Sequence, residues 1–77
     1  MTITVYTLPE CVQCDMTKRT LDSLNVKYDT VDLSQNKEAA SIILDMGYKQ
    51  APVVITDTGH WSGFRLEKLK SLQPIPH

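Results

Sequence analysis

The sequence predicts a single α/β domain over residues 1–77, in which a four-stranded mixed sheet carries helices on its faces. Two observations predict this class. Short runs rich in β-branched residues alternate along the chain with segments whose apolar residues recur every three or four positions. The chain of 77 residues, 42% hydrophobic and 22% charged, has the composition of one small globular domain, and its scattered glycines and prolines leave no linker.

Residues 2–7 predict the first strand, because Ile3 and Val5 alternate with residues that face the other side. After a break at residues 8–10 we expect a helix, with Asn25 as a left-handed C-terminal cap. Its inward positions fall at steps of three and four: Cys14, Thr17, Leu21 and Leu24. On its outer face, opposite charges one turn apart are expected to pair, Asp15 with Arg19 and Lys18 with Asp22.

Residues 26–33 are rich in β-formers and predict a second strand. The following segment predicts a second helix, which Ser34 or Asn36 would cap at its start and Gly47 would close. Residues 48–52 are expected to form a loop, and residues 53–55 a short buried strand.

A turn signal at residues 57–59 separates that strand from one at residues 60–62, so this pair predicts a hairpin. Leu66, Leu69 and Leu72 indicate a last helix, which Pro74 and Pro76 would end. The predicted order is β-α-β-α-β-β-α. Its first crossover should be right-handed between parallel strands, and the hairpin should add two antiparallel strands. This is the minimal thioredoxin-like fold of glutaredoxin type.

Charge and hydropathy exclude several classes of function. The net charge is −1 and the basic residues are interleaved with acidic ones, so we expect no nucleic-acid partner. The N-terminus lacks the basic region and long apolar run of a signal peptide, and no segment is apolar enough to span a bilayer. We therefore expect no membrane association, a cytoplasmic location, a monomer and no cofactor.

The two cysteines stand as Cys11-Val12-Gln13-Cys14, and four interpretations of them compete. A structural disulfide across so short a loop would stabilise by only about 2 kcal/mol, and a reducing cytosol would oppose it. Two unrelated buried thiols do not explain Cys11, which falls in a turn. A zinc site would need further ligands, so we expect no metal, although a soft-metal-binding C-x-x-C module remains an alternative.

Redox catalysis is the fourth interpretation and the one that we favour. At the turn between the first strand and the first helix, Cys11 lies at the helix N-terminus, where unpaired N–H groups and the helix dipole stabilise a thiolate. We expect Cys11 to attack a partner disulfide, and Cys14 then to attack the Cys11 sulfur and release the reduced partner. The like charge of Glu10 would oppose this ionisation slightly.

Pro52 opens the third predicted strand, and within this fold we expect the Ala51–Pro52 bond to be cis. Such a bond would place Pro52 against the disulfide and leave the Ala51 backbone free to pair with an extended substrate segment. The alternative is an ordinary trans proline at the start of an edge strand.

Three motifs spread along nearly the whole chain resemble those of the NrdH-redoxins, bacterial proteins of glutaredoxin size with thioredoxin-like behaviour. They are Cys-Val-Gln-Cys at 11–14, Gln-Ala-Pro-Val-Val at 50–54 and Trp-Ser-Gly-Phe-Arg at 61–65. The resemblance implies that Cys11 attacks, that Cys14 resolves and that Pro52 is the cis-proline. The chain departs from the family pattern after Arg65, where Leu66-Glu67 replaces Pro-Asp.

The resemblance also implies the partners of the reaction. Such proteins take electrons from thioredoxin reductase and pass them to the active-site disulfide of class Ib ribonucleotide reductase, on its large subunit. We expect a partner-binding surface made by residues beside the cysteines and by the turn at 61–65: Val12, Gln13, Ala51, Pro52, Trp61, Ser62, Gly63 and Phe64. For the aromatic residues of this turn, core packing is an equally open interpretation.

A glutathione-dependent glutaredoxin is the runner-up. Similar glutaredoxins usually carry lysine three residues before the first cysteine and a Gly-Gly…Asp turn after the last strand. This chain has Leu8 and a bulkier, apolar turn at those places. A hydrophobic patch there favours docking to a protein over binding a charged tripeptide. His60 is expected to be a solvated strand residue, and His77 part of a tail.

Overall fold

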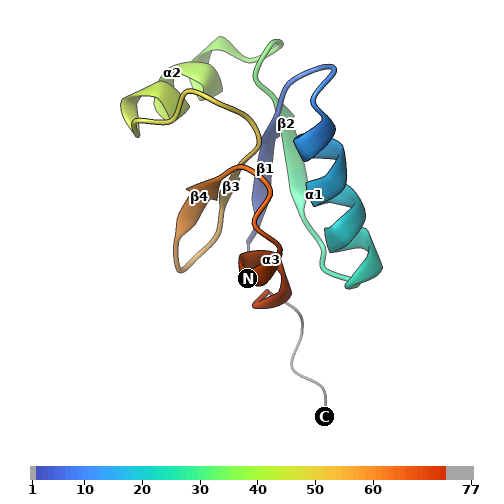
Figure 1. The fold of residues 1–77 in the computed structure, drawn as a ribbon. Coiled ribbons are helices and arrows are strands. Elements are labelled where there is room, and N and C mark those ends of the chain that lie inside the picture. Colours follow the sequence, from blue (N-terminus) through green and yellow to red (C-terminus); the bar gives the residue numbers. More distant parts are fainter. Residues whose placement is uncertain (1, 73–77) are drawn as a thin grey trace.

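The computed structural model describes residues 2–72 and has its elements in the predicted order (Figure 1). They are β1 (Thr4–Thr7), α1 (Val12–Ser23), β2 (Asp29–Asp32), α2 (Lys37–Asp45), β3 (Val53–Ile55), β4 (His60–Ser62) and α3 (Leu66–Lys70). Within residues 2–72, no helix is long and apolar enough to cross a membrane. Pro74, Pro76 and His77, for which we predicted a helix stop and a tail, lie outside the described residues.

The four strands form one mixed sheet in the order β2-β1-β3-β4. β1 runs parallel to β2 and antiparallel to β3, with Val54 opposite Val5, and β4 runs antiparallel to β3, with Trp61 opposite Val54. Helices α1 and α3 pack against each other, while Figure 1 shows α2 lying apart from both. This arrangement confirms the predicted thioredoxin-like fold of glutaredoxin type.

The main core lies between the sheet and the two packed helices. Its buried members are Ile3, Val5, Leu21, Val26, Val54, Trp61, Leu69 and Leu72. The predicted inward face of α1 is confirmed, since Cys14, Thr17 and Leu21 are buried and Leu24 packs against the cluster. The core therefore fixes the N-terminal end of α1, which carries the two cysteines, relative to the sheet.

The ends of the helices follow the predicted caps, while β2 is shorter than predicted. Asn25 and Gly47 both have a positive φ, and Asn36 caps α2 by accepting the Ala39 N–H at 3.0 Å. The second strand begins at Asp29 rather than at residue 26. The reason is that the Val26 N–H is still bonded to the Leu21 carbonyl, which closes α1.

The ion pairs predicted on α1 are wrong in detail. Asp15 pairs with Lys18 at 3.7 Å rather than with Arg19. The carboxylate of Asp22 instead accepts the Tyr28 hydroxyl at 2.9 Å. Side chains three apart on a helix are neighbours as well as those four apart, and a group outside the helix competes for the same carboxylate.

The hydroxyl of Tyr28 is expected to make stability fall at alkaline pH. Burial, together with the bonded Asp22 carboxylate, raises the pKa of Tyr28 from 10.0 to about 12. Between these values the folded state keeps a proton that the unfolded chain loses. The stabilisation is therefore complete below about pH 10 and is lost as the pH rises toward about 12. Because the ring is partly exposed, we expect a loss of only about 1–2 kcal/mol.

Urea denaturation of the oxidised protein across this pH range would measure the loss. Tyr28→Phe cannot titrate and serves as the matched control, so it should lose less stability than the parent. An equal decline in both proteins would show that other groups cause it.

Candidate functional site

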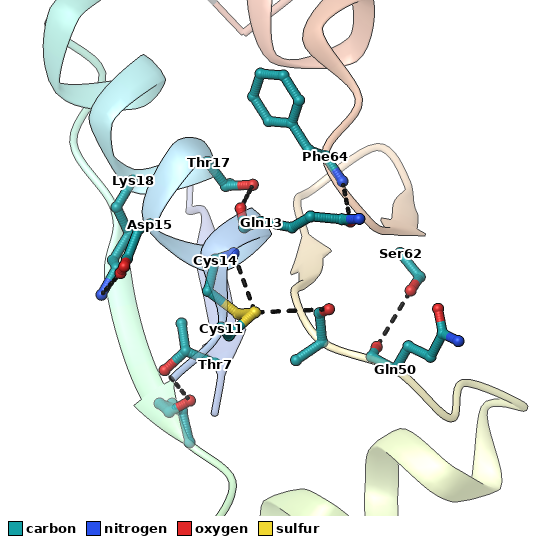
Figure 2. Close-up of a disulfide and its surroundings, with 12 residues drawn as sticks. Thr7, Cys11, Gln13, Cys14, Asp15, Thr17, Lys18, Gln50, Ser62 and Phe64 are labelled. Carbon is teal, nitrogen blue, oxygen red and sulfur yellow. Dashed lines mark hydrogen bonds and ion pairs between the residues drawn. A yellow bond between two sulfur atoms is a disulfide. The ribbon is translucent and has the colours of Figure 1, made fainter. Parts of the chain in front are cut away.

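Cys11 and Cys14 lie where β1 ends and α1 begins, joined as a disulfide (Figure 2). Cys11 is the N-cap residue of α1 and is partly exposed, whereas Cys14 in the first turn is 1% exposed. The helix start thus separates the two sulfurs by accessibility. A partner approaching from solvent meets the sulfur of Cys11 first.

The N-terminus of α1 provides a favourable environment for negative charge on Cys11. Its sulfur accepts the backbone N–H of Cys14 at 3.1 Å. After reduction, a thiolate at this position would keep that hydrogen bond and would lie at the positive end of the helix dipole. Glu10 is exposed to solvent, so water screens its carboxylate from the sulfur.

The loop before β3 faces the disulfide from the other side. The Ala51–Pro52 bond is cis, as expected, and Pro52 is fully buried. The carbonyl oxygen of Ala51 lies 3.8 Å from the sulfur of Cys11. A molecule that binds the Cys11 sulfur therefore lies next to the backbone of Ala51.

Strand β4 fastens this loop through two contacts. The Ser62 hydroxyl donates to the Gln50 carbonyl at 3.2 Å. The Tyr48 hydroxyl and Nδ1 of His60 are 2.5 Å apart, with the two rings in edge contact. His60 is exposed, as expected, but it also contacts Tyr48, and no sequence pattern predicts this contact.

The turn after β4 is hydrogen-bonded to the start of α1 through Gln13. The Phe64 N–H donates to Oε1 of Gln13 at 3.2 Å, and the Gly63 N–H donates to the Pro52 carbonyl at 2.8 Å. Figure 2 shows the Gln13 side chain extending from α1 toward Phe64. The structure thus brings together four of the predicted surface residues, and Gln13 has an internal role besides the expected one.

Of the two open interpretations of Trp61, the structure favours core packing over direct contact with a partner. Its side chain is 8% exposed and belongs to the core, with Nζ of Lys68 at 5.6 Å from the ring centroid. The pairing of β4 with β3 sets Trp61 opposite Val54, which turns both side chains toward the core. Phe64 is partly buried against the same cluster, whereas Val12 is 72% exposed beside the cysteines.

Replacing Gly63 by alanine is expected to destabilise the turn by about 1–2 kcal/mol. Gly63 has a φ of +84°, and an added Cβ would lie 3.4 Å from Oε1 of Gln13. Gly59→Ala is a matched control, since its Cβ would meet nothing within 4 Å. Urea denaturation of both variants checks the difference. Equal losses would mean that the backbone of this turn is unstrained.

A hollow of about 210 Å³ lies between α2 and the loop that carries Ala51, and sequence reasoning missed it. We call it the α2 pocket. Apolar and aromatic side chains dominate its lining: Leu8, Leu33, Ile43, Leu44, Tyr48 and Ala51. Lys49 is the single charged residue among those that line it. Its walls come from four separate segments, so no local pattern in the sequence predicts it.

Metal ligation was the alternative use of the cysteines. Across the described part of the chain, no three His, Cys, Asp or Glu side chains converge as a metal site.

Comparison with known proteins identifies similar sequences and structures. The glutaredoxin family model matches residues 3–61. The glutaredoxin-like protein NrdH of Escherichia coli K12 is 39% identical over 77 residues, covering 100% of this chain and 95% of that protein. The NrdH protein of Lactococcus lactis subsp. lactis is 33% identical over 70 residues, covering 91% and 97%.

The solved structures that resemble this chain include an NrdH-redoxin and a glutaredoxin. The NrdH-redoxin from Escherichia coli, described as having a thioredoxin-like activity profile, superimposes with a TM-score of 0.95 at 38% identity. The match covers 99% of this chain and 100% of that one. A glutaredoxin from Archaeoglobus fulgidus superimposes with a TM-score of 0.75 at 26% identity, covering 91% and 83%.

Proposed function

This chain belongs to the glutaredoxin family, among its NrdH-type members, and on that premise we propose that it carries electrons from thioredoxin reductase to class Ib ribonucleotide reductase. Membership makes it a thiol–disulfide oxidoreductase with Cys11 and Cys14 as its C-x-x-C pair. The electron source and the target are the proposed part. In this proposal the protein acts as a monomer in the cytoplasm and reduces the active-site disulfide of the large subunit.

The observation that carries the choice of electron source is the apolar surface beside Cys11. Glutathione carries two carboxylates and an amine, which need charged or hydrogen-bonding partners. The α2 pocket instead offers Leu8 and Leu44 on its walls, with Lys49 as its one charge. Such a surface favours a protein partner, which gains by covering exposed apolar side chains.

The proposed reaction transfers two electrons in two exchange steps. The thiolate of Cys11 attacks one sulfur of the target disulfide, so that a mixed disulfide forms and the other target sulfur leaves as a thiolate. Cys14 then loses its proton and attacks the sulfur of Cys11. This step breaks the mixed disulfide, releases the second target thiolate and forms the Cys11–Cys14 bond. Thioredoxin reductase would restore the dithiol with electrons from NADPH.

We assign the surrounding residues to partner binding in this scheme. Ala51 would pair its backbone with the extended target segment beside Pro52. The remaining contact surface would be formed by Val12, Gln13, Ser62, Gly63 and Phe64. Trp61 would support this surface from the core rather than touch the partner.

A two-armed assay tests the electron source. NADPH oxidation is followed while the protein reduces insulin, with thioredoxin reductase in one arm and glutathione with glutathione reductase in the other. We expect turnover in the thioredoxin reductase arm alone, and its loss in Cys11→Ser. Turnover in the glutathione arm alone would make the protein a glutathione-dependent glutaredoxin. No NADPH oxidation in either arm, together with tight binding of zinc or copper, would favour the metal-binding alternative.

Reduction of the proposed target needs its own measurement. Oxidised class Ib ribonucleotide reductase replaces insulin, and deoxyribonucleotide formation is measured with the reduced protein as the sole electron donor. We expect sustained product formation with the parent protein. Turnover with insulin but none with this enzyme would overturn the target and keep the electron source.

A further inference from the structure

We propose that the α2 pocket binds an aliphatic side chain of the target segment, located two residues from the cysteine that Cys11 attacks. The inference rests on the proposed function and deepens it, because it specifies which target sequences the site prefers. It assigns a binding role to Leu8 and Leu44, which take no part in the exchange steps.

The position of Ala51 connects the pocket to the reacting sulfur. Ala51 lines the pocket, and its carbonyl oxygen lies 3.8 Å from the sulfur of Cys11. Lys49 and Gln50, which precede it, line the pocket as well. A target segment that pairs along residues 49–51 therefore continues from the disulfide into the pocket.

The geometry of an extended chain selects the residue that enters. Successive side chains of an extended segment point to opposite faces, and alternate ones lie about 6.6 Å apart on one face. When the target cysteine points at Cys11, its immediate neighbours point away toward solvent. The residue two positions along points toward the protein again, on the side where Ala51 lines the pocket.

The lining determines the chemistry of that side chain. Leu44 is 62% exposed and Leu8 is 42% exposed, so a bound apolar group would cover surface that water now contacts. The volume of about 210 Å³ leaves room for a branched aliphatic side chain. A hydroxyl at this place would lose water without gaining an apolar contact in return. A carboxylate would find one cation, Lys49, but this residue is exposed, so the ion pair would contribute little.

A series of short peptides tests the preference directly. Each peptide has one cysteine joined by a disulfide to thionitrobenzoate, which leaves readily because its thiol has a low pKa. Cys11 attacks the peptide sulfur and expels coloured thionitrobenzoate, and Cys14 then releases the peptide thiol. The peptides carry leucine or serine two positions before the cysteine, or two positions after it, or directly beside it. The protein is reduced with dithiothreitol, which is then removed.

We expect leucine at one of the two distant positions to raise the second-order rate constant about tenfold over serine. Leucine directly beside the cysteine should change it less than twofold. Equal rates for leucine and serine at both distant positions would overturn the proposal. A gain at the adjacent position alone would overturn it as well, because that side chain points away from the pocket.

Two variants of α2 locate the effect. Leu44→Gln should reduce the ratio of leucine to serine rates to nearly one. Ile42→Gln is the matched control, since Ile42 is 56% exposed on the same helix but does not line the pocket, and it should keep the ratio. If both variants lost the preference for leucine, or if neither did, the pocket would not be the cause of the preference and the proposal would be overturned. Because each ratio is measured within one protein, partial unfolding of a variant does not imitate the result.

This assay and the two-armed assay fail independently. Dithiothreitol supplies the electrons here, so a preference for leucine would survive if thioredoxin reductase did not serve the protein. Equal rate constants for all peptides would overturn the proposed binding role of the α2 pocket. They would leave the proposed electron source and target unaffected.

Discussion

Replacing Cys11 by serine is expected to reduce disulfide reduction to the uncatalysed rate. A serine hydroxyl is not ionised at neutral pH, and the N-terminus of α1 cannot lower its pKa far enough to change this. Its oxygen also cannot form the mixed disulfide that the first exchange step requires. The measurement is insulin reduction with NADPH and thioredoxin reductase.

Cys14→Ser is the matched variant for this prediction. It also lacks the Cys11–Cys14 bond, so equal unfolding midpoints of the two variants would exclude a difference in folding. With Cys11 intact it should perform the first step and stop there, because the sulfur of Cys14, 1% exposed, is the one that resolves the intermediate. Mass spectrometry should detect the trapped mixed disulfide with Cys14→Ser and not with Cys11→Ser. The reverse result would exchange the roles of the two cysteines.

The fold could be predicted because its local signals and its core agree. Val5 alternates with polar neighbours, and Leu21 repeats with Cys14 and Thr17 at helical steps. Asn25 has the positive φ that its place after α1 predicted. Each signal depends on residues a few positions apart, and the tertiary structure keeps every one of them.

The parts of the site that could not be predicted depend on contacts between distant segments. Gln13 accepts a hydrogen bond from the backbone N–H of Phe64. The type of residue at position 64 does not reveal this contact, because every residue except proline has the same backbone donor. The α2 pocket needs Leu8 and Leu44 on one surface, although Leu8 lies in the loop after β1 and Leu44 in α2. The sequence indicates that such residues are apolar, but only the packing of α2 against the loops beside the sheet decides which of them meet.

Trp61 shows why exposure was the hardest property to predict. The motif at residues 61–65 resembles one that shapes a partner surface in the NrdH-redoxins. From the sequence, core packing and partner contact are equally open for this side chain. The register of a three-residue strand decides which face of the sheet the side chain occupies, because β4 sets Trp61 opposite Val54. A shift of one residue would have turned the indole to the other face of the sheet.

Truncating Trp61 to alanine is therefore expected to destabilise the protein by about 3–5 kcal/mol. This is a large share of the free energy of unfolding of a small domain. Trp61→Phe should cost less, because it leaves a smaller cavity and removes Nε1, a buried donor without a hydrogen-bond partner in the described structure. Urea denaturation followed by circular dichroism is the suitable measurement, since Trp61 is the only tryptophan. A variant Trp61→Ala with parental stability but impaired insulin reduction would instead restore the direct partner contact. The graded loss of stability, alanine well beyond phenylalanine, is the result that core packing requires.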